Sequence, residues 1–203
     1  LEAGLLLKSS FKYFPRNTVH LVVVDPGVGS KRRPILVRTK DYYFVGPDNG
    51  VFNLALKDEV IEGIFELTEE KYFLKPISDT FHGRDIFAPV AAHLSLGRKI
   101  EDFGKRIKNI KQLDLSEPKQ LKNKLVGRIT YIDHFGNLIT NITKDNFEHF
   151  VKGHNFKICI AHKIITRISH SYLEVKRNQP LAIFGSFRNL EISISQANAK
   201  EYL

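Results

Sequence analysis

An acid, a guanidinium and a glycine-rich turn follow one short apolar run of the chain. The run Leu21–Val24 ends at Asp25, the turn Pro26–Gly29 comes next, and Arg32 lies seven residues after the acid. A buried strand that delivers an acid into a glycine-rich turn is the usual arrangement of an α/β active site. The pattern therefore predicts an ion pair at a strand end, where it can meet a substrate.

A histidine in a second polar cluster, Thr80–Asp85, could complete this site. His82 beside the Asp25 and Arg32 pair could orient and deprotonate a water molecule. A purely structural interpretation competes with this one. In it, Asp25 caps the next turn, Arg32 forms a surface salt bridge and His82 is a loop residue. Spacing alone favours the structural interpretation.

A third cluster, Asp133, Phe135 and Asn137, offers a carboxylate, an aromatic ring and an amide within five residues. Such groups suit a nucleoside, because the ring can stack on a base and the polar groups can bind hydroxyls and base edges. The alternative is a hairpin with Gly136 in its turn.

Weaker candidates follow near the carboxyl end. Gly185 would let the backbone approach a ligand, Ser186 could bond to it, and Glu191 could meet a ligand ammonium. No set of Cys, His and Asp has zinc spacing, and neither a nucleophile elbow nor a phosphate-binding loop is present. We therefore expect neither a metal nor a cofactor.

The elements that must position these groups change character along the chain. Residues 1–110 read as helix, strands and helices: 1–13, 19–24, 35–39, 42–45, 51–56, 60–66 and 84–96. They predict an α/β domain with a mostly parallel sheet, whose strand at 19–24 is buried on both faces. The polar segment 111–124 is typical of a linker. Residues 125–203 predict short strands at 125–132, 137–142, 156–161, 163–168, 181–185 and 190–195, as in a small all-β barrel or sandwich.

Composition narrows the possible partners and surroundings. The 203 residues carry a formal charge of +9, but the lysines are scattered and form neither a basic helix nor an aromatic-basic platform. We expect a solvated basic surface without nucleic-acid binding, and no apolar run reaches the roughly 20 residues of a membrane span. A single cysteine, Cys159, predicts a reducing cytoplasm, and its apolar neighbours predict a buried thiol. The chain has no methionine and begins at Leu1 within a helical pattern, so we expect residues to precede it.

Five motifs, in order along the whole chain, closely resemble the S-adenosyl-L-methionine hydroxide adenosyltransferase family, which is related to the fluorinases and chlorinases. They are Val23–Gly29, Gly46–Gly50, Thr80–Pro89, Ile132–Asn141 and Phe184–Phe187. The resemblance implies hydrolysis of S-adenosylmethionine to adenosine and L-methionine, by in-line displacement at the ribose C5′. It reverses the preference for the structural interpretation and implies a catalytic triad of Asp25, Arg32 and His82. His82 and Asp25 would orient and deprotonate the water, and Arg32 would stabilise the hydroxide-like species.

The same resemblance implies the substrate contacts and the assembly. Thr80 and Phe81 would lie near C5′, and Asp133, Phe135 and Asn137 would hold the methionine end and the adenine. The remaining implied ligands are Ser186, Phe187, Glu191, Asn198 and Ala199. Family members are homotrimers with each site between two subunits, and S-adenosylmethionine is their substrate rather than a cofactor. The family begins with a strand whose aspartates bind the ribose, and the sequence from Leu1 starts after that strand. Either the protein lacks the strand, which would weaken ribose binding, or the residues expected before Leu1 supply it.

Two other functions remain open. The halogenating relatives carry Tyr-Ser where this chain has His82-Gly83, and they have an extra loop that is not seen here, so water is favoured over a halide as nucleophile. A non-catalytic adenosine or S-adenosylmethionine binding protein would bind the nucleoside without turnover.

Overall fold

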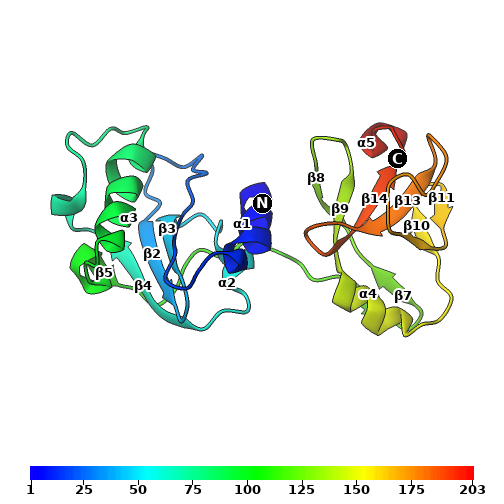
Figure 1. The fold of residues 1–203 in the computed structure, drawn as a ribbon, viewed down its shortest axis with the longest axis horizontal. Helices are drawn as coiled ribbons and strands as arrows, with labels where there is room; N and C mark the ends of the chain where they lie inside the picture. The colour runs from blue at the N-terminus through cyan, green and yellow to red at the C-terminus, as the bar shows by residue number, and fades with distance from the viewer. The chain divides into compact units, whose positions relative to one another are not determined.

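The chain forms two compact units, each with its own core and its own five-stranded sheet (Figure 1). The computed structural model describes residues 1–203, and the units are Leu1–Asp114 and Leu115–Leu203. An α/β unit followed by an all-β unit was predicted from the sequence, and the α/β class of the chain is confirmed. None of the helices is both long and apolar enough to cross a membrane.

The first unit alternates helices and strands. Its elements are α1 (Glu2–Ser10), β1 (Val19–Leu21), β2 (Pro34–Thr39), β3 (Tyr43–Pro47), α2 (Asn53–Leu56), β4 (Ile61–Leu67), α3 (Ala88–Ser95) and β5 (Gly104–Arg106). Short 3₁₀ turns follow α1, β4 and α3, and a π-helical turn, Gly83–Phe87, leads directly into α3. The expected helix over 84–96 is thus present, with an irregular first turn.

The sheet of this unit has the order β1-β3-β2-β4-β5. The prediction of a mostly parallel sheet was wrong, because only β1 and β3 run parallel and the other three pairs are antiparallel. The reason is connection length. A parallel neighbour needs a crossover of a dozen or more residues, whereas β2 and β3 are joined by a short turn.

Both faces of this sheet are covered, which explains the nearly continuous apolar runs. Ile35 and Val37 pack with α1 and α2 on one face, while Leu36 and Val45 pack with α3 on the other. Successive residues of a strand point to opposite faces, so one run supplies both cores. The edge strand β1 is the exception.

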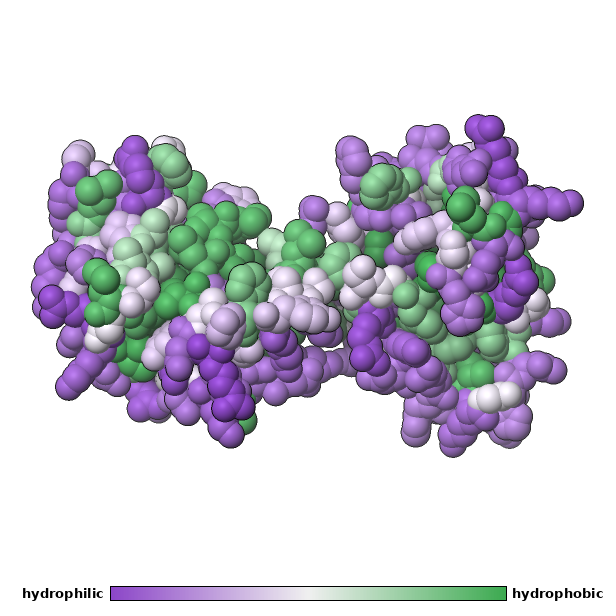
Figure 2. Space-filling model, viewed as in Figure 1, coloured by the Kyte–Doolittle hydropathy of each residue, from purple (hydrophilic) through white to green (hydrophobic).

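β1 is shorter and more exposed than the sequence predicted. It ends at Leu21, although the Val22 amide still donates to the Val45 carbonyl, at 3.0 Å. Leu21, Val23 and Val24 are exposed, so the segment is not buried on both faces as predicted. An edge strand has one neighbour only, and Figure 2 shows apolar side chains gathered on the visible face of this unit.

The second unit is built on an open sheet. Its elements are β6 (Lys119–Leu121), β7 (Lys124–Val126), β8 (Ile129–Ile132), β9 (Leu138–Thr143), α4 (Lys144–Val151), β10 (Ile158–Ile160), β11 (Lys163–Ile165), β12 (Ile168–Ser169), β13 (Pro180–Phe184), β14 (Asn189–Ile194) and α5 (Ala199–Tyr202). The main sheet has the order β12-β13-β14-β9-β8 and does not close into a barrel. The prediction of an all-β unit also missed α4 and α5.

One face of this sheet is apolar and the other carries buried polar groups. Leu138, Ala182 and Ile192 face a core shared with Phe147 of α4. Glu191 and Ser193 of β14 lie on the opposite face and are also buried. Cys159 was expected in a core, but it is exposed on β10, a strand of a separate two-stranded sheet that has one neighbour only.

Candidate active site

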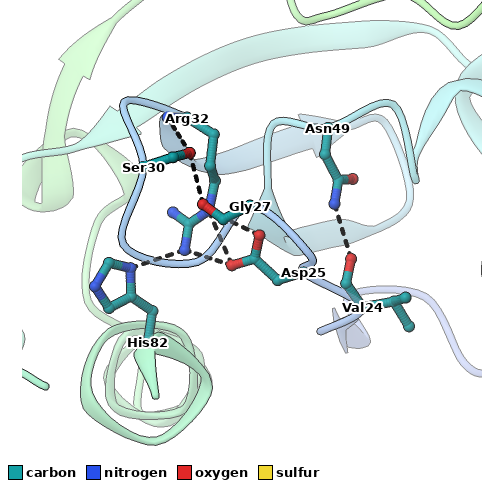
Figure 3. A network of polar contacts seen from close by, with 7 residues as sticks. All are labelled: Val24, Asp25, Gly27, Ser30, Arg32, Asn49 and His82. Atoms are coloured by element: carbon teal, nitrogen blue, oxygen red, sulfur yellow. Dashed lines mark hydrogen bonds and ion pairs between the residues drawn. The ribbon is translucent and has the colours of Figure 1, made fainter. Parts of the chain in front are cut away.

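Asp25 and Arg32 form a buried, two-pronged ion pair at the end of the β1 segment (Figure 3). Arg32 Nε donates to both carboxylate oxygens, at 3.0 and 2.9 Å, and Arg32 Nη2 donates to Oδ2 at 2.5 Å. The Asp25 side chain is 5% exposed and that of Arg32 is 9% exposed. A surface salt bridge of this kind was the competing interpretation, and the burial does not fit it.

The same guanidinium reaches His82. Arg32 Nη2 lies 2.8 Å from His82 Nδ1, so the three predicted catalytic side chains form one connected network (Figure 3). A guanidinium is only a donor, so Nδ1 must be the acceptor. The proton of the neutral ring is therefore on Nε2. This bond assigns the tautomer of His82 and directs an N–H away from Arg32.

A tight turn brings Arg32 back to Asp25. The Val28 amide donates to the Asp25 carbonyl at 3.2 Å, and the Ser30 hydroxyl donates to the Gly27 carbonyl at 2.6 Å. Gly29 has φ of +75°, and a Cβ placed there would lie 2.5 Å from the Asp79 carbonyl oxygen. Glycine is needed at 29 both for the backbone angle and for the close approach of the 79–82 segment.

The π-helical turn before α3 delivers His82 to this network. A Cβ on Gly83 would lie 3.1 Å from the Val23 side chain, so the small residue lets the turn approach the β1 segment. The Arg32 guanidinium lies over the Phe87 ring, 5.1 Å from its centroid. Extra residues of this kind in a helix are frequent at functional sites.

Asp85 anchors the loop that carries Thr80 and Phe81. Its side chain is fully buried, and its Oδ2 accepts a hydrogen bond from the Ser78 amide at 2.8 Å. Arg84 Nε donates to Oδ1 at 2.6 Å, and this bond holds the pKa of Asp85 below its usual value. Phe81 itself is exposed beneath the Arg84 guanidinium. Asp85 belongs to the Thr80–Asp85 cluster, but the spacing of that cluster alone does not predict its structural role.

The Gly46–Gly50 motif supports the same turn from the other side. Asn49 Nδ2 donates to the Val24 carbonyl at 2.8 Å, just before Asp25 (Figure 3). Arg33 Nη2 lies 2.5 Å from Asp48 Oδ2, in a second ion pair. An open cavity of about 820 Å³ adjoins the turn, and Gly27, Arg32 and Asn49 are among its lining residues. Its size suits a nucleoside-sized ligand.

In the second unit, Asp133 organises its own turn. Asp133 Oδ1 accepts from the amides of Phe135 and Asn137, at 2.9 and 2.8 Å, and Oδ2 accepts from Asn137 Nδ2 at 2.8 Å. The hairpin interpretation is thus correct for the backbone, with Gly136 at φ of +85°. It leaves the Phe135 ring 76% exposed, a large apolar surface that no contact within the turn accounts for.

The carboxyl-terminal segment packs on this turn. A Cβ on Gly136 would lie 1.9 Å from Asn198 Oδ1, and the Lys200 amide donates to the Gly136 carbonyl at 3.1 Å. Ala199 is fully buried next to Asn198. The structure therefore brings Asn198 and Ala199 to the Asp133–Asn137 turn.

The last predicted residues lie at the β13–β14 turn and behind it. Ser186 is exposed and Phe187 is half-buried in the turn, which the Arg188 amide closes by donating to the Gly185 carbonyl at 2.9 Å. Glu191 is only 6% exposed and bonds with Tyr172, a residue that the sequence analysis did not consider. No group of three or more His, Cys, Asp and Glu side chains is arranged to hold a metal ion.

Comparisons with known proteins agree with this arrangement. The models of the N-terminal and C-terminal domains of SAM hydroxide adenosyltransferase match residues 1–104 and 127–203. The chain belongs to the SAM hydroxide adenosyltransferase family. The resemblance found in the sequence motifs is therefore confirmed.

Three proteins show how similar this family member is to known sequences and structures. It is 37% identical to an (R)-S-adenosyl-L-methionine hydrolase of Methanocaldococcus jannaschii, over all of this chain and 73% of that protein. A fluorinase of Actinopolyspora mzabensis is more distant, at 25% identity over 73% of this chain and 60% of the fluorinase. A crystal structure of an uncharacterized conserved protein from Thermotoga maritima has a TM-score of 0.86 and 35% identity, and covers 99% of this chain and 78% of that one.

Proposed function

We propose that this family member hydrolyses S-adenosyl-L-methionine to adenosine and L-methionine, with Asp25, Arg32 and His82 as its catalytic residues. One observation carries the proposal: Arg32 joins the buried Asp25 carboxylate to the partly buried His82 ring, and Arg32 also lines the adjoining cavity. The names of the hydrolase relatives at over 30% identity support the same chemistry.

The reaction needs a positioned nucleophile more than a strong one. A lone pair of water forms the O–C5′ bond while the C5′–S bond breaks, and the electron pair leaves with sulfur as the neutral thioether of methionine. The sulfonium is an excellent leaving group, so alignment of the water supplies most of the acceleration. One proton of the water must leave as adenosine forms.

The tautomer of His82 divides the roles within the network. His82 Nε2–H donates a hydrogen bond to the oxygen of the water and orients it. Arg32 carries no acceptor and the basic nitrogen of His82 faces Arg32, which leaves Asp25 as the proton acceptor among the three. Arg32 holds both partners and stabilises the hydroxide-like oxygen in the transition state.

Recognition of the substrate falls to groups in the loop before His82 and in the turns of the second unit. Thr80 and Phe81 lie on the loop that leads to His82, and they line the site near C5′. In the second unit, Asp133, Phe135 and Asn137 contact the adenine and methionine ends. Ser186, Phe187 and Asn198 provide further contacts, and the buried Ala199 holds the segment that carries Asn198. The exposed Phe135 ring supports a binding role for this unit.

The assembly, the location and the partners of the protein are also proposed. We propose a cytoplasmic homotrimer with each site between two subunits. We also propose that it needs no cofactor and binds neither nucleic acid nor membrane. Equilibrium sedimentation with and without S-adenosylmethionine tests the trimer.

A turnover assay in labelled water tests the function. The protein is incubated with S-adenosylmethionine in ¹⁸O-water, with and without chloride or fluoride. The nucleosides are then separated by chromatography and their masses are measured by mass spectrometry. We expect adenosine with the label in its 5′-hydroxyl, and no 5′-halo-adenosine. Asp25→Ala and His82→Ala should abolish most of this product, whereas the exposed Asp58→Asn and His162→Ala serve as matched controls.

Each other outcome rejects part of the proposal. A halogenated nucleoside as the main product would make the protein a halogenase. Tight binding of S-adenosylmethionine without any product would make it a binding protein. Full activity in His82→Ala and Asp25→Ala would reject the catalytic network while leaving hydrolysis in place.

A further inference from the structure

A buried carboxylate in the second unit is held by two hydroxyl donors. Glu191 Oε1 accepts from the Tyr172 phenol at 2.8 Å and from the Ser193 hydroxyl at 2.9 Å. Glu191 is 6% exposed and Ser193 is fully buried. A carboxylate with this burial and these partners is directed into the protein and is poorly placed to meet a substrate ammonium.

The bond to Tyr172 spans the sheet. Ser169 of β12 pairs with Ile183 of β13, which pairs with Glu191 of β14. Tyr172 lies three residues after Ser169, so the loop after β12 crosses over β13 to reach Glu191. The Tyr172 residue remains 42% exposed, and its phenol is close enough to Asp133 to be influenced by that charge.

The other oxygen of Glu191 lies against the β13–β14 turn. A Cβ on Gly185 would lie 2.6 Å from Glu191 Oε2. A side chain at residue 185 would therefore displace either the Glu191 carboxylate or the turn that carries Ser186 and Phe187. Glu191 thus bonds to the Tyr172 loop and also lies against the β13–β14 turn.

We propose that Glu191 is a positioning residue that fixes the Tyr172 loop and the Gly185–Phe187 turn for substrate binding, and that it does not contact the substrate. This inference rests on the proposed function for its kinetic readout only. It replaces the expectation, drawn from the sequence, that Glu191 binds the substrate directly.

Conservative substitution separates positioning from direct binding. Glu191→Gln keeps an oxygen that accepts from Tyr172 and Ser193 but removes the charge that an ammonium would need. We expect its KM for S-adenosylmethionine to stay within about twofold of the parent. Glu191→Ala leaves both donors without their acceptor, and we expect KM to rise about tenfold, as for the loss of a hydrogen bond to a charged group, with kcat nearly unchanged.

Tyr172→Phe provides a second variant, which removes the phenol hydroxyl and keeps the ring. It should raise KM by a similar factor, and the double variant Glu191→Ala with Tyr172→Phe should be no worse than the poorer single one, because both remove the same contact. Glu148→Gln and Tyr13→Phe, two exposed positions, are the matched controls.

A titration without substrate tests the contact itself. Burial raises the pKa of the Tyr172 phenol well above its usual value, and the hydrogen bond to the Glu191 carboxylate raises it further. Phenolate absorbance of the native protein should therefore show one tyrosine that resists ionisation. That tyrosine should be lost in Tyr172→Phe and should ionise at lower pH in Glu191→Gln.

Two results would overturn the inference. If Glu191→Gln raises the KM for S-adenosylmethionine as much as Glu191→Ala does, Glu191 is a direct ligand. If Tyr172→Phe leaves KM unchanged and Glu191→Gln leaves the tyrosine titration unchanged, the bond has no role in solution. Failure of the proposed function is a separate result, because a parent protein that makes no adenosine still reports on Tyr172 through its titration.

Discussion

Arg32 Nη2 donates a hydrogen bond of 2.8 Å to His82 Nδ1, across 50 residues of sequence. The bond joins the turn after β1 to the π-helical turn before α3. Because the same guanidinium binds Asp25, a single side chain sets both the position and the tautomer of the histidine. The activity of a variant at position 82 should therefore depend on which nitrogen of the histidine the new side chain replaces.

Replacements of His82 should rank by the position of their amide. Glutamine places an N–H near the position of Nε2, whereas asparagine reaches only the position of Nδ1. We expect His82→Ala and His82→Asn to lose about 10²- to 10³-fold in kcat, in the range of a lost preorganised hydrogen-bond donor, and His82→Gln to lose about tenfold less than that. Rates at saturating S-adenosylmethionine measure the order. An asparagine variant as active as the glutamine variant would show that Nε2 is not the working nitrogen.

A methyl group at Gly29 should damage the site more than one at Gly97. Both glycines have positive φ, +75° and +85°, so alanine costs about 1 kcal/mol of backbone strain at either position. Only at Gly29 does the added Cβ meet an obstacle, the Asp79 carbonyl at 2.5 Å, whereas nothing lies within 4 Å at Gly97.

We therefore expect Gly29→Ala to lose at least tenfold in kcat/KM, because the turn and the 79–82 segment must separate. Gly97→Ala should keep its activity and lose only stability. Steady-state kinetics with thermal unfolding of both variants make the comparison. Equal activity in the two would mean that the close approach of the segments has no catalytic value.

Sequence motifs predicted that Asp25, Arg32 and His82 belong together, because each stands in a short, distinctive segment, and the structure connects the three side chains. They could not predict the sheet. The apolar run at 19–24 is typical of a strand buried on both faces, but the Leu21 and Val24 side chains are exposed at an edge. Neighbours decide burial, and the run itself does not record which neighbours it has.

The missed residues have the same explanation. Asp85 and Tyr172 act through contacts that fold closure creates, with the Ser78 amide and with Glu191. Helix α4 was missed although Thr143 and Asn146 form a reciprocal cap, because its sequence is polar and follows directly on a strand. Tertiary contacts gave Asp85 and Tyr172 their roles, whereas the signal for α4 was the local cap of Thr143 and Asn146.

Loss of the Asp85 charge should loosen the loop that carries Thr80 and Phe81. The hydrogen bond from Arg84 keeps the pKa of Asp85 below its usual 3.8, so the carboxylate is charged throughout the neutral range. Asp85→Asn removes that charge and weakens the bond from the Ser78 amide. We expect KM for S-adenosylmethionine to rise about fivefold or more, in line with a weakened charged hydrogen bond.

The stabilising effect of this carboxylate should disappear only in acid. A depressed native pKa gives stability that is present above the unfolded value and is lost as pH falls below it. The parent and Asp85→Asn should therefore differ in thermal stability at neutral pH and converge at acidic pH. A constant difference across that range would mean that the charge of Asp85 is not what holds the loop.

His20 should make the first unit sensitive to mild acid. The ring is 8% exposed, stacks on Phe44 at 5.2 Å, and meets Phe11, Phe14 and Tyr42 edge-on or tilted. Its Nε2 has no hydrogen-bond partner. Burial lowers the pKa of His20 below 6.5, because loss of hydration disfavours the charged imidazolium.

The sign of the pH effect follows from this lowered pKa. Above pH 6.5 the ring is neutral in both the folded and the unfolded state, so it contributes no pH dependence. Below pH 6.5 His20 binds a proton in the unfolded chain but stays neutral in the folded chain. The free energy of unfolding therefore falls by up to about 1.4 kcal/mol per pH unit. Protonation thus favours unfolding of the unit that contains Asp25 and His82.

Replacement by phenylalanine isolates the effect. His20→Phe keeps an aromatic ring in the cage and cannot be protonated, while the other seven histidines are common to both proteins. Hydrogen exchange of β3 peptides in denaturant, followed from neutral to mildly acidic pH, reports on this unit alone. We expect the parent to lose protection as pH falls and His20→Phe to lose distinctly less. Parallel losses in the two proteins would assign the acid sensitivity to other groups, because only His20 differs between them.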